Sequence, residues 1–555
     1  MAIISINKKI FEKEIGKLDE KMQERIAMFG TPIETINEQE LQLEIFPNRP
    51  DMLSYHGFKR AFLGFLGKKT GLISYKINKP EKNYRVTVDS SVNSIRPYTV
   101  CAIVKNLKFD SEKIKEIIDV QEKIHFTLGR KRKKLAIGIY PLEKIKLPIT
   151  FKALEPDKIK FRPLESEREM SGLEILQKHP AGKEYAHLLA GKVKFPVFID
   201  AENKILSMPP VINSDLTGKI TQETKDVFIE CSGFDWAALN KCLNIITTTL
   251  ADMGGEIYQM EVKYKRTYLT PDLAPEKMKI NLDDANKLLG LELKEKEIKN
   301  LLEKMGHNYS KGIVEIPAWR VDVLHEVDLI EDIAIAYGYE NFTPEIPEIS
   351  TIGQESQTEI IKRKISEILT GLNFLELSNF HLTKKPDQFA KMGLNEKNSK
   401  EVLEIENSKT DYNILRKDLS HYALKILSEN VDVEYPQKIF ETGRVFCVSE
   451  KTNEISESEK LCLAITPGNF TEAKQVIEYL FKMMDLNIKI DEPDIQQDAP
   501  VHFIEGRTAK IIFEGKTIGY LGEIHPKILS NWRIKMPVSL CEISLEDIFE
   551  KLGTD

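Results

Sequence analysis

A segment near the middle of the chain, residues 315–341, constrains the fold more than any other part of the sequence. It begins as a short apolar strand that ends at Pro317. Further on, apolar side chains recur at the three- and four-residue spacing of an amphipathic helix. Gly338 supplies a natural stop for that helix. The segment therefore predicts a strand followed by a helix with one face in a core.

The same segment is unusually acidic. The carboxylates within eleven residues include Asp322, Asp328, Glu331 and Asp332. The last three would share one face of a helix, where like charges repel, so a positive group or a proton should lie among them. A hard cation such as Mg²⁺, which prefers carboxylate oxygens, is one explanation. The other is that acidic residues simply favour the start of a helix, and the spacing leaves both open.

Length and composition set broad limits on the fold. At 555 residues the chain suggests about three to four domains, and 41% apolar with 30% charged residues lets each domain bury a core. A net charge of −7 does not indicate a nucleic-acid binder, although a local patch could still bind one. The basic run 130–134 is by itself more typical of a solvated loop.

Six cysteines form no CxxC pair and have no histidine at zinc spacing, which favours buried thiols in a reducing compartment. No apolar run approaches the ~18 residues of a membrane span, and the first residues lack the design of a signal peptide. These features predict a soluble cytoplasmic protein.

Hydrophobic patterns divide the chain into four predicted domains. The lysine-rich, proline-containing stretch 77–83 and the proline-rich stretch 342–350 are interpreted as linkers. The last domain is predicted as an antiparallel sheet with helices on one side. Two local predictions are a single helix over 11–30 and a strand over 263–269. The predicted domains are 1–76 (N-terminal), 84–264 (mixed helix and strand), 268–345 (two short helices, a strand and the acidic helix) and 355–555 (sheet domain).

Several segments together resemble one protein family. PAWRVDVLHEVDLIEDIAIAYGYEN resembles the metal-binding module of the phenylalanine–tRNA ligase β subunits, and EIFPNRPDMLSYHGFKRA resembles their N-terminal signature. RPYTVCAIVKNL, QEKIHFTLGRKRKKLAIGIYPL and ILSMPPVINSD are similar to their editing module. FETGRVF and IGYLGEIHPKIL are similar to their C-terminal domain. The matches follow the family's order over nearly the whole chain, and the length resembles the archaeal and eukaryotic cytosolic type.

The resemblance implies a fold and a set of partners. The fold is multidomain α+β: a small N-terminal α/β domain, an α+β editing domain, a winged-helix-like metal module, and a class II synthetase-like antiparallel sheet domain lacking an active site. In the family the β subunit joins an α subunit in an (αβ)₂ tetramer, in which α binds ATP and phenylalanine and charges tRNA(Phe). The lack of a GxGxxR-like motif, with only Gly506 and Arg507 side by side, agrees with that loss.

The resemblance also implies two sites. The family's Mg²⁺ positions, reached jointly with the α subunit, fall on Asp322, Asp328, Glu331 and Asp332. The editing pocket, which hydrolyses mischarged tyrosyl-tRNA(Phe), falls on Ser207, Asn213, Glu230 and Ser232. A carboxylate can accept the hydrogen bond of a phenol, which phenylalanine cannot offer, so Glu230 is expected to recognise tyrosine. The other three are expected to make polar contacts and place a water.

Two departures from the family pattern leave an alternative open. The family often has Asp at position 230 and Thr at position 232, so the reach of both side chains differs here. A tRNA-binding scaffold subunit with an inactive editing site therefore stands beside the editing enzyme. A free-standing Mg²⁺-dependent enzyme is a third, weaker reading.

Overall fold

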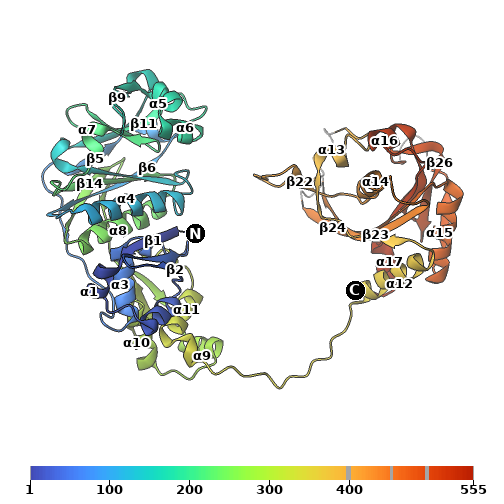
Figure 1. Cartoon of the computed structure of the whole chain (residues 1–555), viewed down its shortest axis with the longest axis horizontal. Helices are drawn as coiled ribbons and strands as arrows, with labels where there is room; N and C mark the ends of the chain where they lie inside the picture. The colour runs from blue at the N-terminus through green and yellow to red at the C-terminus, as the bar shows by residue number, and fades with distance from the viewer. Residues whose placement is uncertain (1, 396–401, 450–453, 494–498, 554–555) are drawn as a thin grey trace. The chain divides into compact units, whose positions relative to one another are not determined.

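The computed structural model describes residues 2–395, 402–449, 454–493 and 499–553. The chain is a multidomain α+β protein that divides into two compact units, Met1–Ile346 and Pro347–Asp555 (Figure 1). Each unit has hydrophobic cores of its own. The finer division into four domains remains a prediction. None of the helices in the described residues combines the length and the apolar character needed to cross a bilayer.

The first unit begins with a small three-stranded antiparallel sheet in the order β1-β3-β2. The single helix predicted over 11–30 is two helices, because Asp19 caps a new one by accepting the backbone N–H of Met22 at 3.0 Å. The elements are β1 (Ala2–Asn7), α1 (Lys8–Glu14), α2 (Glu20–Met28), β2 (Ile33–Ile36), β3 (Glu40–Ile45) and α3 (Tyr55–Phe65).

An eleven-stranded sheet dominates the first unit, with nine strands in the order β13-β12-β11-β8-β5-β15-β6-β14-β7 and β4 and β16 paired with β15. Its strands are β4 (Ile77–Asn78), β5 (Arg85–Val88), β6 (Tyr98–Lys105), β7 (Leu135–Pro141), β8 (Ile149–Leu154), β11 (Phe195–Ile199), β12 (Ile205–Met208), β13 (Ile212–Asn213), β14 (Val227–Gly233), β15 (Glu256–Lys263) and β16 (Thr267–Thr270). The predicted strand over 263–269 is wrong: it spans the end of β15, a turn and the start of β16, which pair antiparallel.

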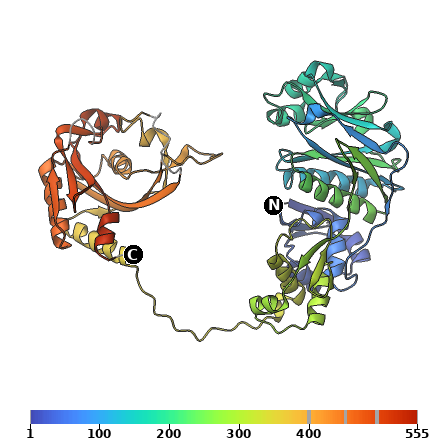
Figure 2. The same cartoon turned by 180° about the vertical axis from the view of Figure 1, so that it is seen from behind.

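Two long helices cover one face of this sheet, as Figures 1 and 2 both show. They are α4 (Ser111–Phe126) and α8 (Trp236–Asp252), and they contact β6, β7 and β14. Alternate residues of β14 point to opposite faces: Val227, Ile229 and Cys231 belong to the core beneath the helices. Phe228 belongs to a separate core on the other face. The candidate site lies on that second face.

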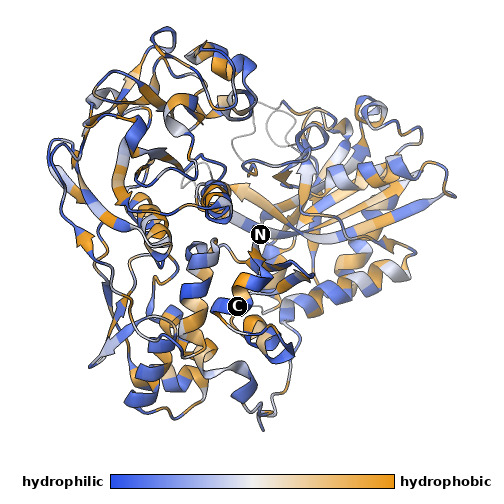
Figure 3. Cartoon of the chain, turned by 60° about the vertical axis from the view of Figure 1, so that its left-hand side comes forward, coloured by the Kyte–Doolittle hydropathy of each residue, from blue (hydrophilic) through white to orange (hydrophobic). Residues whose placement is uncertain are grey.

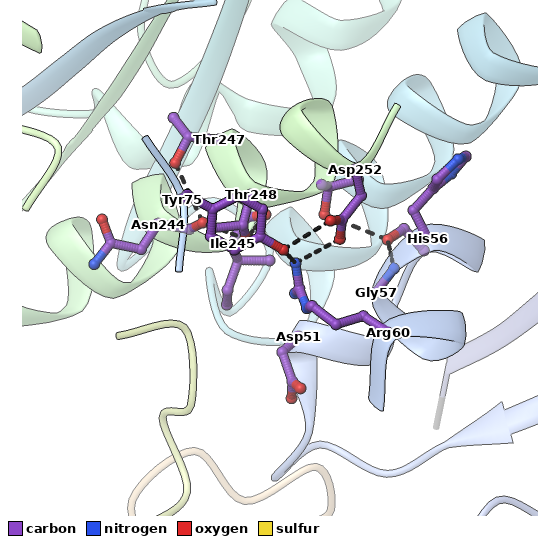
Figure 4. Close-up of polar contacts among 12 residues, drawn as sticks. Asp51, His56, Gly57, Arg60, Tyr75, Asn244, Ile245, Thr247, Thr248 and Asp252 are labelled. Carbon is purple, nitrogen blue, oxygen red and sulfur yellow. Dashed lines mark hydrogen bonds and ion pairs between the residues drawn. The ribbon is translucent and has the colours of Figure 1, made fainter. Parts of the chain in front are cut away.

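A buried ion pair joins the N-terminal elements to the large sheet (Figure 4). Arg60 of α3 donates to Asp252 at the end of α8 at 2.7 Å and to the hydroxyl of Tyr75 at 2.9 Å. Tyr75 in turn donates to the other oxygen of Asp252 at 2.7 Å. This closed ring pairs Nη1 of Arg60, the Tyr75 hydroxyl and both carboxylate oxygens of Asp252, which helps a buried ion pair to be tolerated, whereas Nε and Nη2 of Arg60 are buried without partners.

The first unit ends with a compact block of helices around a three-stranded sheet, β17-β19-β18. The predicted strand and helix of the acidic segment are present as β19 and α11, and Gly290 ends α9 in the left-handed conformation with φ +66°. The elements are β17 (Glu276–Lys279), α9 (Leu282–Leu289), α10 (Glu295–Lys304), β18 (Asn308–Ser310), β19 (Ile313–Ile316) and α11 (Glu326–Tyr337).

The second unit is a seven-stranded sheet in the order β20-β23-β24-β28-β27-β26-β25, antiparallel except for the β20–β23 pair. Its strands are β20 (Leu375–Glu376), β23 (Gln437–Val448), β24 (Ile455–Thr466), β25 (Ile488–Asp491), β26 (Phe503–Phe513), β27 (Lys516–Ile524) and β28 (Ser539–Ser544). Figure 3 shows hydrophobic residues concentrated on the sheets and on the sides of helices that pack against them.

Helices cover both faces of this second sheet, which corrects the prediction of helices on one side. In β24, Leu461 and Leu463 join a core with α12 and α15, whereas Cys462 and Ala464 join a separate core with α14. The sequence analysis did not identify α14, and strand alternation alone does not show what covers the second face. The helices are α12 (Gln357–Gly371), α14 (Ser420–Glu429), α15 (Phe470–Met483) and α17 (Glu546–Lys551).

Candidate functional site

A cavity of about 370 Å³ opens beside β7, the edge strand of the large sheet. Its walls come from α4, the start of β7, the helix α6 (Pro180–Tyr185) and the turn before β13. Two of the four expected editing residues, Asn213 and Glu230, line it. The cavity therefore connects a solvent-facing edge to polar groups on the buried face of the sheet.

Glu230 is the buried acid of this site. It lies in the middle of β14 with only 2% of its surface exposed. Burial raises the pKa of Glu230 to about 8, against the opposing effect of the Arg96 guanidinium. Its Oε2 atom is buried and has no hydrogen-bond partner. A buried carboxyl oxygen without a partner lowers the stability of the fold. Such an atom therefore indicates a ligand-binding or catalytic role.

The other carboxyl oxygen of Glu230 is in contact with a tyrosine of the chain. The hydroxyl of Tyr140 lies 3.3 Å from Glu230 Oε1 and 3.3 Å from Asn213 Oδ1. Gly138 pairs directly with Glu230 across β7 and β14. A Cβ atom at Gly138 would lie 2.2 Å from the Tyr140 hydroxyl and 2.6 Å from Glu230 Oε1, so only glycine permits this contact.

Ser232 and Ser207 are both buried beside these groups. Arg96 donates from Nε to the hydroxyl oxygen of Ser232 at 3.0 Å and from Nη2 to its carbonyl oxygen at 2.5 Å. The Ser207 hydroxyl has no hydrogen-bond partner, and Ser207 pairs with Asn213 between β12 and β13. Neither serine is among the residues lining the cavity. All four expected residues therefore lie in one region, but only Asn213 and Glu230 line the cavity.

Two residues of this region, Tyr140 and Arg96, were missed by the sequence analysis. Tyr140 lies two residues beyond Gly138 in a strand that reads as wholly apolar, and Arg96 stands 136 positions from the serine it binds. The register between β7 and β14 brings Tyr140 to Glu230, and Arg96, just before β6, reaches Ser232 through its side chain. A polar residue on the same strand face as a glycine was the one local signal available.

His179 lies in the cavity wall. Its Nε2 donates to the carbonyl oxygen of Leu164 at 3.0 Å, because a carbonyl can only accept. In the neutral ring this leaves Nδ1 as the acceptor, and Nδ1 is buried without a partner. His125, by contrast, uses Nε2 to accept the N–H of Ile137 at 2.8 Å, which makes it a structural residue.

The basic run lies in a strained turn at the cavity. Arg130, Lys131 and Arg132 all have left-handed φ values, of 48°, 53° and 62°. Arg132 lines the cavity and donates to the carbonyl oxygen of Val211 at 2.8 Å. Successive non-glycine residues in this conformation are costly and persist where the surroundings require them. Arg130 and Lys131, in the same turn, are exposed to solvent.

The acidic segment is organised around a guanidinium. Arg320 donates to both oxygens of Asp322, at 2.8 and 2.7 Å, and to Asp332 at 2.9 Å. His307 contacts the same oxygen of Asp332 at 2.7 Å. Asp332 is 3% exposed, so it lies toward the core and not on the exposed face that the sequence predicted. Burial acts to raise the pKa of Asp332, but Arg320 and His307 outweigh it and lower that pKa.

The remaining two carboxylates differ from this pair. Asp328 accepts the backbone N–H groups of Leu324 and His325, both at 2.7 Å, at the start of α11. Glu331 is exposed, and partial burial together with the neighbouring carboxylates raises its pKa.

Among the described residues of this chain alone, these four carboxylates do not form a metal site, and the magnesium site expected jointly with the α subunit stays a prediction. Three of them already have partners in the chain, and the described residues contain no group of three or more acidic, histidine or cysteine side chains arranged to hold a metal. The positive charge that the spacing required is Arg320, two residues before Asp322.

Comparisons with known proteins bear on the whole chain. Three family models match it: the B3/4 domain over residues 88–248, the tRNA synthetase B5 domain over 278–339, and the phenylalanyl tRNA synthetase beta chain CLM domain over 343–545. The phenylalanine–tRNA ligase beta subunit of Thermococcus sibiricus is 42% identical over 513 residues, which cover 91% of this chain and 90% of that protein. The chain belongs to the phenylalanine–tRNA ligase beta subunit family.

Other relatives agree. The beta subunit of Archaeoglobus fulgidus is 37% identical and covers 99% of both chains. A crystal structure of an N-terminal fragment of the Pyrococcus horikoshii beta subunit is 39% identical, with a TM-score of 0.57 over 60% of this chain and 99% of that one. The family predicted from the sequence motifs is therefore confirmed, and membership supports a role in phenylalanyl-tRNA synthesis.

Proposed function

We propose that this chain acts as the beta subunit of a phenylalanine–tRNA ligase and that its cavity hydrolyses mischarged tyrosyl-tRNA(Phe). The observation that carries the proposal is the buried carboxyl of Glu230, with one oxygen left unpartnered at a cavity of about 370 Å³. The partner is an α subunit that binds ATP and phenylalanine in an (αβ)₂ tetramer in the cytoplasm. On this proposal Pro347–Asp555 is a class II synthetase-like scaffold without an active site, and β17 to α11 form a winged-helix-like module.

Chemical discrimination explains why such a site is needed. Phenylalanine and tyrosine differ by one hydroxyl, and an apolar pocket rejects an added hydroxyl only weakly. A site built around a buried hydrogen-bonding group instead accepts tyrosine and rejects phenylalanine, which has no hydroxyl to pair with that group. Phenylalanine would leave Glu230 Oε2 unpaired, which costs about 1–3 kcal/mol, whereas the phenol of tyrosine satisfies it. Glu230 would thus select the tyrosyl ester for hydrolysis.

Hydrolysis itself requires a placed water and a proton acceptor. His179 Nδ1 is the proposed acceptor: it takes a proton from water as the water oxygen attacks the ester carbonyl, and returns it to the departing ribose oxygen of the tRNA. The products are free tyrosine and uncharged tRNA. Ser207, Asn213 and Ser232 supply the polar contacts that orient the ester and the water.

The strained basic turn is the proposed contact for the tRNA acceptor strand. Arg130, Lys131 and Lys133 are exposed beside the cavity wall. Phosphate neutralisation by such side chains is independent of sequence and falls with salt. On this proposal the left-handed backbone at 130–132 has a role, because it forms the turn that carries these cations.

One observation favours the second candidate, a tRNA-binding scaffold with an inactive editing site. The hydroxyl of Tyr140 already contacts the carboxyl expected to read the substrate phenol, and Arg96 already contacts Ser232. If both contacts persist when tRNA binds, and if Glu230 Oε2 cannot be reached, the site would recognise nothing.

A hydrolysis assay separates the two candidates. The chain is assembled with its α subunit, and release of amino acid is followed from preformed tyrosyl-tRNA(Phe) and phenylalanyl-tRNA(Phe). We expect rapid tyrosine release, lowered at least tenfold by His179→Ala, while ATP-dependent charging with phenylalanine continues. His187→Ala, on the exposed surface, is the matched control. Tyrosine release no faster than spontaneous hydrolysis by the unsubstituted complex would establish the scaffold.

A further inference from the structure

The two carboxyl oxygens of Glu230 have different surroundings. Oε1 lies 3.3 Å from the Tyr140 hydroxyl, whereas Oε2 is buried and unpartnered. The Ser207 hydroxyl is a second buried group without a partner in the same region. Glu230 therefore has one oxygen held by the protein and one left over.

Tyr140 is itself held rigidly. It is fully buried, and its ring stacks on Phe228 with centroids 5.7 Å apart and planes 29° apart. Its hydroxyl also lies 3.3 Å from Asn213 Oδ1, on the strand that pairs with Ser207. Gly138 leaves the space through which the hydroxyl reaches Glu230. Three strands thus converge to fix one phenolic oxygen against the carboxyl.

We propose that Tyr140 is a positioning residue for substrate selection: its hydroxyl fixes Glu230 Oε1, so that Oε2 and the Ser207 hydroxyl remain for the phenol of a tyrosyl ester. This inference rests on the proposed editing function and names the group that makes the site selective. A carboxyl without Tyr140 could rotate and satisfy either oxygen internally, which would remove the penalty against phenylalanine.

If Glu230 is protonated, each hydrogen bond in this cluster can have one donor and one acceptor. With its pKa raised to about 8 by burial, the carboxyl is mostly protonated at neutral pH. The Tyr140 hydroxyl has a single proton and lies 3.3 Å from both Glu230 Oε1 and Asn213 Oδ1. When Tyr140 donates to Asn213, a protonated Glu230 can donate through Oε1 to the Tyr140 oxygen. Oε2 is then the carbonyl-type oxygen, which can accept the phenol O–H. The Ser207 hydroxyl can donate to the same phenol.

The experiment compares Tyr140→Phe with two other variants in the assembled ligase. Tyr258→Phe is the matched control, because it removes a hydroxyl from β15 of the same sheet whose partner is the exposed Glu256. Gly138→Ala keeps the tyrosine but places a Cβ atom where its hydroxyl lies. The kcat/KM for amino-acid release is measured for tyrosyl-tRNA(Phe) and phenylalanyl-tRNA(Phe).

We expect Tyr140→Phe and Gly138→Ala to lower kcat/KM for the tyrosyl substrate about tenfold, through KM more than kcat, as befits loss of about one hydrogen bond in binding. The phenylalanyl substrate should change little, so selectivity collapses, and Tyr258→Phe should match the unsubstituted chain. Phenylalanine charging by the same preparations reports whether each variant folds and assembles.

Two results would overturn the proposal. Unchanged selectivity in Tyr140→Phe would show that Glu230 needs no positioning, and faster tyrosine release would show that Tyr140 blocks the site. If Tyr140→Phe fails to assemble, the Gly138→Ala result decides. Absence of tyrosine release by the unsubstituted complex is a different failure, because it removes the editing function itself.

Discussion

At the scale of single residues, the proposed function depends on the burial and the contacts of Glu230. The family resemblance identified this residue, but its protonation and its two unequal oxygens arise from burial and from Tyr140. Neither could be predicted from the sequence, because Tyr140 and Arg96 reach the site only through strand register and through contacts between distant segments. The identity of the acidic residue could be predicted from the sequence, whereas its raised pKa could not.

The raised pKa has a consequence for stability. In the unfolded chain Glu230 releases its proton near 4.5, and in the native state it does so near 8. The native state therefore binds more protons in this window, and its stability falls as the pH rises from about 4.5 to about 8, by at most about 5 kcal/mol. We expect Glu230→Gln to remove this loss, so that the variant gains stability over the unsubstituted chain as the pH rises.

Denaturant midpoints of both proteins, measured between pH 5 and pH 8, test this expectation. The difference between them should widen with pH. Parallel curves would mean that Glu230 titrates near its ordinary value and is solvated.

At the scale of elements, the acidic segment shows what a local pattern can and cannot predict. The strand, the helix and most of the helix's apolar face follow from the spacing of residues 315–341. The inward position of Asp332 does not, because it depends on His307, which lies outside this segment, and on an ion pair with Arg320, twelve residues earlier within it. Two of the expected metal ligands, Asp322 and Asp332, therefore pair with Arg320 within this chain.

Removing one member of that buried group should be costly. Asp332→Ala leaves Arg320 and His307 without their shared carboxylate, and we expect a loss of about 3–5 kcal/mol. Glu331→Ala, one residue away on the exposed side, should change stability by less than about 0.5 kcal/mol. Thermal unfolding of the two variants, with and without Mg²⁺ or a chelator, provides the measurement. Stabilisation by Mg²⁺ that Glu331→Ala abolishes would restore the metal interpretation.

The basic turn before β7 is a second element whose role was not fixed by its sequence. Its left-handed backbone places cations beside the cavity, which composition alone could not show. We expect Lys131→Glu combined with Lys133→Glu to weaken tRNA(Phe) binding and to reduce its salt dependence by about one unit of slope per lost phosphate contact. Lys21→Glu, exposed on α2, is the control. Equal salt slopes for all three proteins would exclude the turn from the tRNA contact.

At the scale of the whole molecule, the order of motifs along the chain was enough to predict the family and the α+β class. Patterning did not predict the strand order of the large sheet, in which β5 and β8 lie beside strands far away in sequence. It also missed that α14 covers the second face of the C-terminal sheet. Long-range pairing and the burial of a second sheet face are properties of the assembled core, and a local pattern carries little information about either.

The most direct test of substrate recognition by Glu230 is the ratio of tyrosine to phenylalanine release from preformed aminoacyl-tRNA(Phe) by the assembled ligase, with Glu230 changed to Gln and to Ala. We expect a strong preference for tyrosine in the unsubstituted chain. Gln should retain much of that preference, because its amide oxygen still accepts a phenol, and Ala should abolish it. A preference that survives Glu230→Ala would contradict the assignment of substrate recognition to this carboxyl.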